Sequence, residues 1–287
     1  MCGYNQLNDN HKNNETQIGI HMNDKKKTLQ QQYIKEKYGL IARNSGSCCD
    51  FSPSPCCSSS NETPIELSIK IGYSPQEISD VPEGANLNLG CGNPQMLASL
   101  KLGEVVLDLG SGAGFDSFLA ARQVGLRGKV LGIDMTAEMV KKARENAVKG
   151  AYLNTFFQLG QIERIPLRDN CIDVIISNCV INLSTDKTRV FREAYRVLKP
   201  GGRLAISDTI ALTELPEEIK NDLDLYSACF AGAMEYKKLE HLLEAIGFSN
   251  IRVDFAEKGF DITRNWSLSH NLKDYIRSAA ISANKIL

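Results

Sequence analysis

From Gly103 onward, short runs of β-branched residues alternate with stretches in which apolar residues recur at helical spacing. This alternation is typical of a βαβ sheet, in which buried strands are separated by helices. Strands are predicted at 104–109, 129–133, 154–159, 172–177, 203–209, 250–255 and 278–284. Helices are predicted at about 115–125, 137–149, 186–198, 216–230 and 235–246. The last two strands are expected to close the sheet as a hairpin. The predicted fold class is therefore α/β, with a doubly wound, Rossmann-like, seven-stranded sheet.

The N-terminal part of the chain lacks this alternation of strand and helix patterns. Residues 1 to about 23 carry almost no periodic apolar pattern and are predicted to be a solvated tail. A short amphipathic helix is expected next, with Asn23 or Asp24 as its cap and Gly39 at its end. Its apolar residues at helical spacing are Leu29, Tyr33, Ile34 and Tyr38. The following segment, SGSCCDFSPSPCCSSSNETP, is too rich in Ser, Pro and Gly to sustain a regular element.

Composition and net charge exclude some classes of binding partner. The chain has 287 residues, of which 43% are hydrophobic, and its 33 Lys+Arg against 34 Asp+Glu give a formal charge of -1. Such a balance offers no broad basic face, so neither nucleic acid nor an anionic membrane is an expected partner. No apolar signal segment is found near the start and no 18-residue apolar run follows, so a cytoplasmic location is predicted. There the nine cysteines are expected to serve metal, redox or nucleophilic chemistry rather than a disulfide framework.

The segment EVVLDLGSGAGFDSFLAARQ places a glycine-rich turn between a strand and a helix. Gly110, Gly112 and Gly114 would let the backbone pass close to a ligand. Asp134 follows the second strand, where a carboxylate can accept both hydroxyls of a ribose. Two ligands fit this pattern, a nicotinamide dinucleotide and S-adenosylmethionine.

Two acidic residues favour S-adenosylmethionine. Asp108 and Asp116 flank the turn, where they would repel the phosphate that a dinucleotide seats on the helix N-terminus. Carboxylates instead suit a ligand that carries an ammonium and a sulfonium. After the third strand, Ile162 and Glu163 are placed to bracket an adenine.

Over roughly residues 85–210 the chain resembles the class I S-adenosylmethionine-dependent methyltransferases, through the ordered motifs DLGSGAGFD, GIDM, IERIPL and LKPGG. The resemblance implies Asp134 as the ribose partner, Met135 against the adenine and Asp108 near the methionine end. The predicted cofactor-binding residues are Asp108, Gly110, Ser111, Gly112, Gly114, Asp134, Met135, Ile162, Glu163 and Asn178. The expected organisation is an N-terminal extension with a Cys-rich loop (1–64), a methyltransferase core (65–210) and a C-terminal region that completes the sheet and covers the substrate (211–287).

Cysteine positions point to the substrate. Cys179 lies just beyond the fourth strand, at the edge where open α/β sheets bind ligands, whereas Cys171 precedes the same strand at the opposite edge. Cys229 lies within the helical segment after the fifth strand, and Cys91 lies between two glycines ahead of the core. Three thiols from three segments can therefore converge on one point.

Several soft thiolates beside a methyl donor could bind either of two elements, zinc or trivalent arsenic. Zinc can activate a thiol substrate, but the chain has neither CxxC nor Cys/His spacing. Trivalent arsenic prefers thiolate ligands, takes up to three of them, and keeps a lone pair that can attack a methyl group. Arsenic is the better fit.

The segments NLGCGNP, SNCVINL and CFAGA are similar to the cysteine-bearing segments of the arsenite methyltransferases, in their shorter prokaryotic type, and the likeness runs from about Tyr33 to the C-terminus. The resemblance implies As(III) ligation by Cys179 and Cys229, with Cys91 as a third ligand or as the partner of an upstream cysteine. That upstream cysteine is expected to be Cys48 or Cys49. The doublet Cys56 and Cys57 is also near.

The resemblance further implies a reaction course. Arsenite or its glutathione adduct would be captured by thiolates, its lone pair would attack the sulfonium methyl in line, and no general base would be required. The methylated product would be formally pentavalent, and protein thiols would reduce it by forming a disulfide such as Cys91 with Cys48 or Cys49, which thioredoxin or glutathione would reset. Two alternatives remain: a methyltransferase for a small organic metabolite such as a quinone precursor, and a non-catalytic thiol module that sequesters or senses metals.

Overall fold

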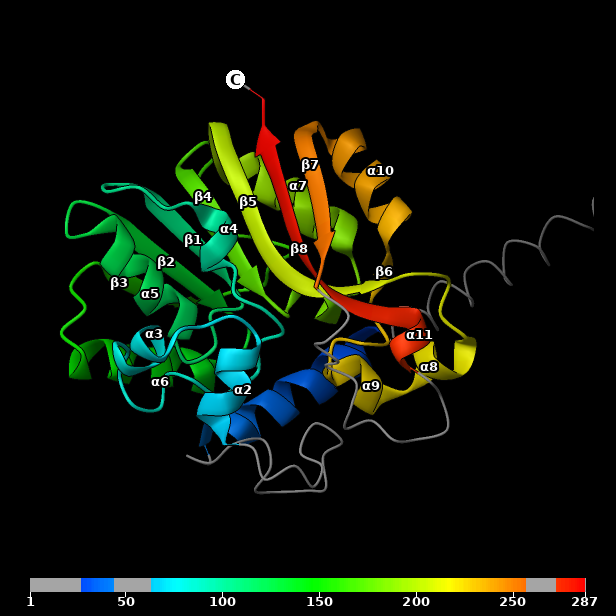
Figure 1. Cartoon of the computed structure of the whole chain (residues 1–287), viewed down its shortest axis with the longest axis horizontal. Coiled ribbons are helices and arrows are strands. Elements are labelled where there is room, and N and C mark those ends of the chain that lie inside the picture. Colours follow the sequence, from blue (N-terminus) through cyan, green and yellow to red (C-terminus); the bar gives the residue numbers. More distant parts are fainter. Residues whose placement is uncertain (1–26, 44–62, 257–271, 287) are drawn as a thin grey trace, which may run out of the picture.

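A computed structural model describes residues 27–43, 63–256 and 272–286. Its centre is one mixed sheet with the strand order β3-β2-β1-β4-β5-β8-β7 (Figure 1). The strands along this path are β1 (Val105–Leu109), β2 (Lys129–Asp134), β3 (Thr155–Leu159), β4 (Ile172–Asn178), β5 (Leu198–Ala211), β7 (Phe248–Phe255) and β8 (Ile276–Lys285). The two-residue β6 (Met234–Glu235) pairs with the end of β5. The predicted doubly wound, Rossmann-like sheet is confirmed.

Strand directions separate two parts of the sheet. The strands β3, β2, β1, β4 and β5 are parallel, whereas β8 is antiparallel to both β5 and β7. The expected pairing of the last two strands is confirmed, with β8 inserted between β5 and β7. The fifth strand begins at Leu198 rather than 203 because Leu198 already pairs with Ile172 before a register shift.

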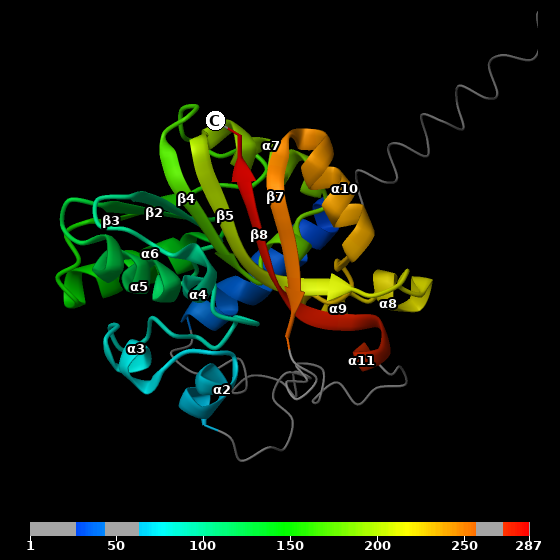
Figure 2. The same ribbon diagram turned by 45° about the horizontal axis from the view of Figure 1, so that its top comes forward.

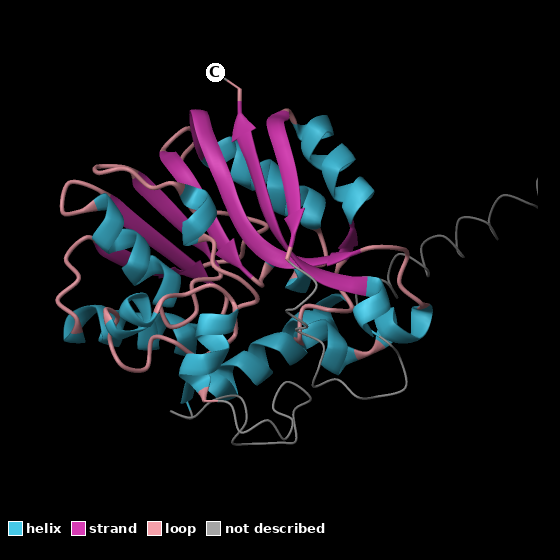
Figure 3. Ribbon diagram, in the orientation of Figure 1, coloured by secondary structure: helices cyan, strands magenta, loops and turns pink. Residues whose placement is uncertain are grey.

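Helices cover both faces of the sheet (Figures 1 and 3). On one face lie α4 (Gln95–Ala98), α5 (Phe115–Val124) and α6 (Ala137–Lys149), and on the other lie α7 (Lys187–Val197) and α10 (Tyr236–Ile246). The alternation of side chains along β1 explains the two cores. Val106 belongs to one apolar cluster with the alanines of α5, whereas Leu107 belongs to another that includes Phe191 of α7 and Leu243 of α10.

The prediction of one continuous helix at 216–230 is wrong. The structure has two short helices, α8 (Glu217–Asn221) and α9 (Leu223–Ser227). Asp222 separates them because its extended backbone (φ −79°, ψ 115°) breaks the helix and its side chain accepts a hydrogen bond from Leu225 N–H as the N-cap of α9. Cys229 consequently lies beyond α9 rather than within a helix, in a left-handed conformation with φ 66°.

The N-terminal helix also extends beyond its predicted end at Gly39. Residues 27–43 are helical, so Gly39 does not end this helix, and the proposed caps Asn23 and Asp24 lie outside the described residues. Gly39 is buried, and a Cβ there would lie 3.4 Å from the carboxyl of Glu138 on α6. Tertiary packing against α6 therefore overrides the helix-breaking tendency of glycine.

The N-terminal helix lies next to the chain segment that follows β5, as Figures 1 and 2 show. Tyr33 and Lys37 both donate to the Asp224 carboxylate of α9, at 2.8 and 3.0 Å, and Tyr38 OH donates to Ser227 O. The helix also reaches α6 through Arg43, whose guanidinium lies 2.8 Å from a Glu138 carboxylate oxygen. It therefore bridges two segments at the carboxyl edge of the parallel strands.

The shorter helices α2 (Pro64–Lys70), α3 (Pro75–Ser79) and α11 (Leu272–Tyr275) complete the described chain, with a 3-10 turn, η3 (Ile181–Leu183), after β4. Among the described helices, none combines the length and apolar character that a membrane crossing needs.

Candidate active site

A pocket opens at the carboxyl edge of β1, β2 and β4, and the glycine-rich turn after β1 forms one of its walls. Gly110 and Gly112 have left-handed φ angles of 69° and 50°, where other residues are strained. A Cβ on Gly110 would lie 2.4 Å from Val180 Cγ2, whereas one on Gly112 would meet nothing within 4 Å. The buried Ser111 hydroxyl has no hydrogen-bond partner among the described residues. An unpartnered buried polar atom is costly, so the turn fits a ligand that approaches the backbone closely and supplies that partner.

Two buried carboxyl groups form an acidic wall. Asp108 accepts a hydrogen bond of 2.6 Å from Ser117 Oγ, and Asp116 accepts 2.7 Å from Tyr73 OH and 3.1 Å from Asn178 Nδ2. Burial, together with the charge of Asp116, raises the pKa of Asp108 to about 8, and burial also raises the pKa of Asp116. A cationic ligand would stabilise both ionised carboxylates. The ammonium and sulfonium of S-adenosylmethionine meet this requirement, and the phosphates of a dinucleotide do not.

Asp134 ends β2 and faces the same pocket. Its two oxygens each accept one backbone hydrogen bond, 3.0 Å from Gly112 N and 2.8 Å from Thr136 N. A carboxylate has about four acceptor sites, so Asp134 can still accept a ligand hydroxyl beside these bonds and the side-chain hydrogen bond from Thr136. The position therefore suits a ribose.

Nine of the ten predicted cofactor residues line this pocket, namely Asp108, Gly110, Ser111, Gly112, Asp134, Met135, Ile162, Glu163 and Asn178. Gly114 is not among the lining residues. It is the N-cap of α5 with φ 97°, and a Cβ there would meet the rings of Phe118 and Phe157. Glycine is needed at this position for the close packing of the helix on the sheet. Direct cofactor contacts by all ten residues stay predictions.

Several residues of the pocket could not be predicted from the sequence. Tyr73 reaches Asp116 from the loop after α2, and no sequence pattern marks it. Gln31 and Tyr38 line the pocket from the N-terminal helix. The helical spacing of Tyr38 was visible in the sequence, but its neighbour in space was not, because the helix docks on residues about 190 positions away.

Three thiols meet beside the pocket. The sulfurs of Cys91 and Cys179 lie within 4.8 Å of each other, and Cys229 Sγ donates to Cys179 O at 2.7 Å. Cys91 and Cys229 are 5% and 1% exposed. Among these three, Cys179 alone lines the pocket. The predicted convergence of Cys91, Cys179 and Cys229 therefore occurs, with Cys179 in the middle.

The environment keeps these thiols protonated in the free protein. The neighbouring Cys179 thiol, together with burial, raises the pKa of Cys91 well above the usual range. The Cys229 thiol and burial do the same for Cys179, although the Cys91 thiol opposes that shift, and burial raises the pKa of Cys229 although the Cys179 thiol lowers it. Cys179 and Cys229 also have left-handed backbones, with φ angles of 57° and 66°. Such conformations cost about 1–3 kcal/mol for a residue other than glycine and concentrate at functional sites.

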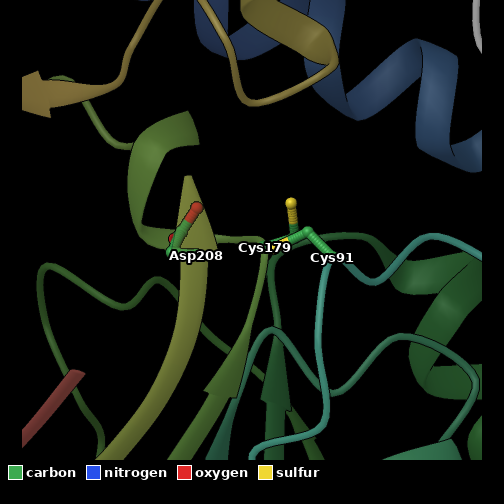
Figure 4. A group of neighbouring side chains, drawn as sticks. All are labelled: Cys91, Cys179 and Asp208. Carbon is green, nitrogen blue, oxygen red and sulfur yellow. The ribbon is translucent and has the colours of Figure 1, made fainter. Parts of the chain in front are cut away.

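Asp208 of β5 is the fourth member of this cluster and was not predicted (Figure 4). Its carboxylate oxygen and the sulfurs of Cys91 and Cys179 lie within 4.8 Å of one another. Burial raises the pKa of Asp208 to about 6, although the nearby Lys187 ammonium opposes that shift. Asp208 accepts hydrogen bonds from Ile181 N and from Asn182 Nδ2, so it holds the turn that follows Cys179.

Cys171 lies at the start of β4, away from this cluster, as predicted, and its thiol donates to Arg168 O. Cys48, Cys49, Cys56 and Cys57 lie outside the described residues.

A sheet of this order with a ligand pocket at the carboxyl edge of its parallel strands defines a class I methyltransferase. A methyltransferase domain model matches residues 100–247. An arsenic(III) S-adenosylmethionine methyltransferase from Chlamydomonas reinhardtii superposes with a TM-score of 0.57 and 32% sequence identity, over 79% of this chain and 75% of that one.

Sequence relatives define the family within this class. An arsenite methyltransferase from Halobacterium salinarum is 41% identical over 278 residues, which cover 95% of this chain and 70% of the relative. An arsenite methyltransferase from Aquipseudomonas alcaligenes is 40% identical over 77% of this chain and 62% of its own length. The chain belongs to the arsenite methyltransferase family, whose methyl donor is S-adenosylmethionine.

Proposed function

We propose that this chain transfers methyl groups from S-adenosylmethionine to trivalent arsenic held by cysteine thiolates. The observation that carries the proposal is the convergence of three free cysteines, Cys91, Cys179 and Cys229, beside the pocket. Family membership supports the same substrate. A methyltransferase that needed its cysteines only for packing would have no reason to gather three thiols at the edge of the cofactor pocket.

The proposed capture step is a ligand exchange. Each thiol gives its sulfur to arsenic while its proton leaves with a hydroxide of arsenous acid as water, so an As–S bond replaces an As–O bond. Neutral thiols can stand in contact without mutual repulsion until the substrate arrives. Soft sulfur ligands favour arsenic over hard cations such as Mg²⁺. Cys179 is proposed as the central ligand because it contacts both other thiols and also lines the pocket.

The acidic wall and Asp134 are proposed to orient the donor. S-adenosylmethionine supplies an electrophilic sulfonium methyl when it is bound. Asp108 and Asp116 would hold its cationic end, Asp134 its ribose, and Ile162 its adenine. The arsenic lone pair is the nucleophile and carries no proton to be removed. The rate enhancement would therefore come from positioning of the two reactants rather than from base catalysis.

The region after β5 is proposed to cover the substrate. Cys229, Phe230 and Leu225 from this region pack in one apolar cluster with Ile34 of the N-terminal helix and with Cys179. Exclusion of water there would protect thiol-bound arsenic from hydrolysis. We further propose that methyl transfer leaves the arsenic formally pentavalent, and that Cys91 with Cys48 or Cys49 gives it two electrons, which returns arsenic to the trivalent state and joins the two cysteines in a disulfide. Thioredoxin or glutathione would then reduce this disulfide, and the reducing cytoplasm is proposed as the site of action.

Arsenic speciation tests the proposal. Purified protein is incubated with arsenite, S-adenosylmethionine and either glutathione or thioredoxin, and methylated arsenicals are measured. Cys179→Ser should abolish their formation and leave S-adenosylhomocysteine binding intact. Cys171→Ser is the matched control, since it removes a thiol at the opposite edge of the sheet, and it should retain activity.

Three results would refute the assignment. Full activity of Cys179→Ser would remove the central ligand from the mechanism. Cofactor binding by the wild-type protein without any methylated arsenical would redirect the search to a small organic substrate, and arsenic binding without cofactor binding would favour metal sequestration.

A further inference from the structure

Asn178, the last residue of β4, lies between the cofactor pocket and the thiol cluster. Its Oδ1 accepts a 3.0 Å hydrogen bond from the backbone N–H of Cys91, and its Nδ2 donates at 2.7 Å to Gly92 O. A Cβ on Gly90 would lie 2.6 Å from Asn178 Nδ2, so the amide is packed tightly against this loop. One side chain therefore holds the backbone on both sides of the Cys91 thiol.

The same amide also reaches the acidic wall. Nδ2 lies 3.1 Å from Asp116 Oδ2 and 2.9 Å from Tyr73 OH, while Tyr73 donates its own hydroxyl hydrogen to Asp116 Oδ1. An amide nitrogen has two hydrogens, and here it faces three acceptors, counting Gly92 O. In the free protein Asp116 therefore competes with the Cys91 loop for the same two hydrogens.

We propose that Asn178 is a positioning residue that couples cofactor binding to arsenic capture, an inference that rests on the proposed function. A ligand ammonium at the acidic wall supplies Asp116 with a stronger hydrogen-bond donor than a neutral amide. The two hydrogens of Asn178 then serve Gly92 O and Tyr73 OH. The loop that carries Cys91 is held more firmly beside Cys179, so the thiols bind arsenic more tightly when the cofactor is present.

This coupling is reciprocal, because each ligand must change the affinity of the other by the same factor. A coupling in the usual range corresponds to an affinity change of about 5- to 150-fold. Its source is a difference in contacts between two states of one side chain. It therefore predicts dependence on the ammonium of the ligand and on the amide of Asn178.

The test measures arsenite affinity at the thiol cluster alone. The full-length protein is labelled with methyl methanethiosulfonate, and labelling of Cys179 is quantified by peptide mass spectrometry over a series of arsenite concentrations. The arsenite concentration that half-protects Cys179 is determined without ligand, with S-adenosylhomocysteine, and with methylthioadenosine, which lacks the amino-acid end. S-adenosylhomocysteine has no methyl to transfer, so no turnover occurs.

For the wild-type protein, S-adenosylhomocysteine should lower the half-protecting concentration about tenfold, within the usual range of coupling, and methylthioadenosine should leave it unchanged. In Asn178→Ala the effect of S-adenosylhomocysteine should vanish, while both ligands still bind at saturation. Asn93→Ala is the matched control. Asn93 is a buried asparagine of the same loop that donates to Gly72 O and accepts from Gln95 N, and the structure shows no hydrogen bond from its side chain to Asp116 or Cys91, so its loss should leave the tenfold effect in place.

Each other outcome overturns the inference in a recognisable way. A tenfold effect that persists in Asn178→Ala, or that disappears equally in Asn93→Ala, removes the role of Asn178. An equal effect of methylthioadenosine in the wild-type protein removes the role of the ammonium and needs no variant that might be unstable. If neither S-adenosylhomocysteine nor methylthioadenosine changes the arsenite affinity of the wild-type protein, the coupling is refuted and the proposed function stands. If arsenite does not protect Cys179 at all, both are refuted.

Discussion

Replacement of Asp108 by Asn tests the electrostatics of the pocket most directly. Burial raises the pKa of Asp108 from 3.8 to about 8, and the charge of Asp116 adds to the effect. Because the folded-state pKa lies above the unfolded-state value, the folded protein binds this proton more tightly. Folding stability is therefore greatest below about pH 4 for this group and is lost as pH rises through about 8. The loss amounts to about 1.4 kcal/mol for each pH unit within that window.

Between pH 6 and pH 8 the ligand-free wild-type protein should lose about 2 kcal/mol of stability from this carboxyl group, since the slope levels off near the folded-state pKa. For a chain of 287 residues that loss corresponds to a decrease of about 3 °C in Tm. Asp108→Asn cannot ionise, so its Tm should fall less over the same interval. Thermal unfolding at both pH values measures the difference. Asp173→Asn is the control, because Asp173 pairs with Lys199 at the opposite edge of the sheet.

The same carboxyl group predicts a pH-dependent cofactor affinity. A ligand ammonium favours ionised Asp108, so binding below pH 8 releases a proton. The affinity for S-adenosylhomocysteine, measured by calorimetry, should rise nearly tenfold from pH 6 to pH 7 and level off above pH 8. Asp108→Asn should bind more weakly and without this slope. A flat wild-type profile, or the same slope in the variant, would refute the electrostatic reasoning.

Three further variants address the pocket, the core and the N-terminal helix. Gly110→Ala places a methyl group against Val180 at a left-handed φ of 69°. The affinity for S-adenosylhomocysteine should therefore fall at least about tenfold, equivalent to about 1.4 kcal/mol. An unchanged calorimetric Kd would contradict a close approach of the ligand to the backbone at Gly110. Phe118→Ala empties a fully buried site and should cost about 3–5 kcal/mol in urea unfolding; a loss below about 1 kcal/mol would show that the core collapses around it. Tyr38→Phe removes the hydroxyl that donates to Ser227 O and should cost about 1 kcal/mol of local stability, seen as faster hydrogen exchange in the N-terminal helix; unchanged exchange would show that this contact does not hold the helix.

Local sequence patterns predicted most of the fold because each strand and its following turn carry their own signal. The β-branched runs of β1, β2 and β4 are buried on both faces, so continuous apolar segments mark them. The two errors have different causes. Gly39 remains helical because a tertiary contact, its packing on Glu138, overrides a local tendency, whereas Asp222 divides a predicted helix through a local contact, since its side chain caps α9.

The candidate site divides in the same way. The turn with Gly110 and Gly112, and the carboxylates Asp108 and Asp134, lie at strand ends, where chain order alone places them around one ligand. Tyr73 and Asp208 carry no comparable signal, because each reaches the site through contacts that are set by the docking of distant segments.

By itself, the sequence determined the doubly wound sheet, the glycine-rich turn with its acidic neighbours, and the set of thiols able to bind a soft element. Short-range physics suffices for these features, because hydrophobic periodicity and backbone sterics act over a few residues. Only the tertiary structure decided that Cys179 stands between Cys91 and Cys229 and that Asn178 contacts both the acidic wall and the Cys91 loop. Hydrogen bonds between segments about 50 to 90 residues apart, and the burial that raises the pKa of each thiol, exist only once the sheet has brought these strand ends together.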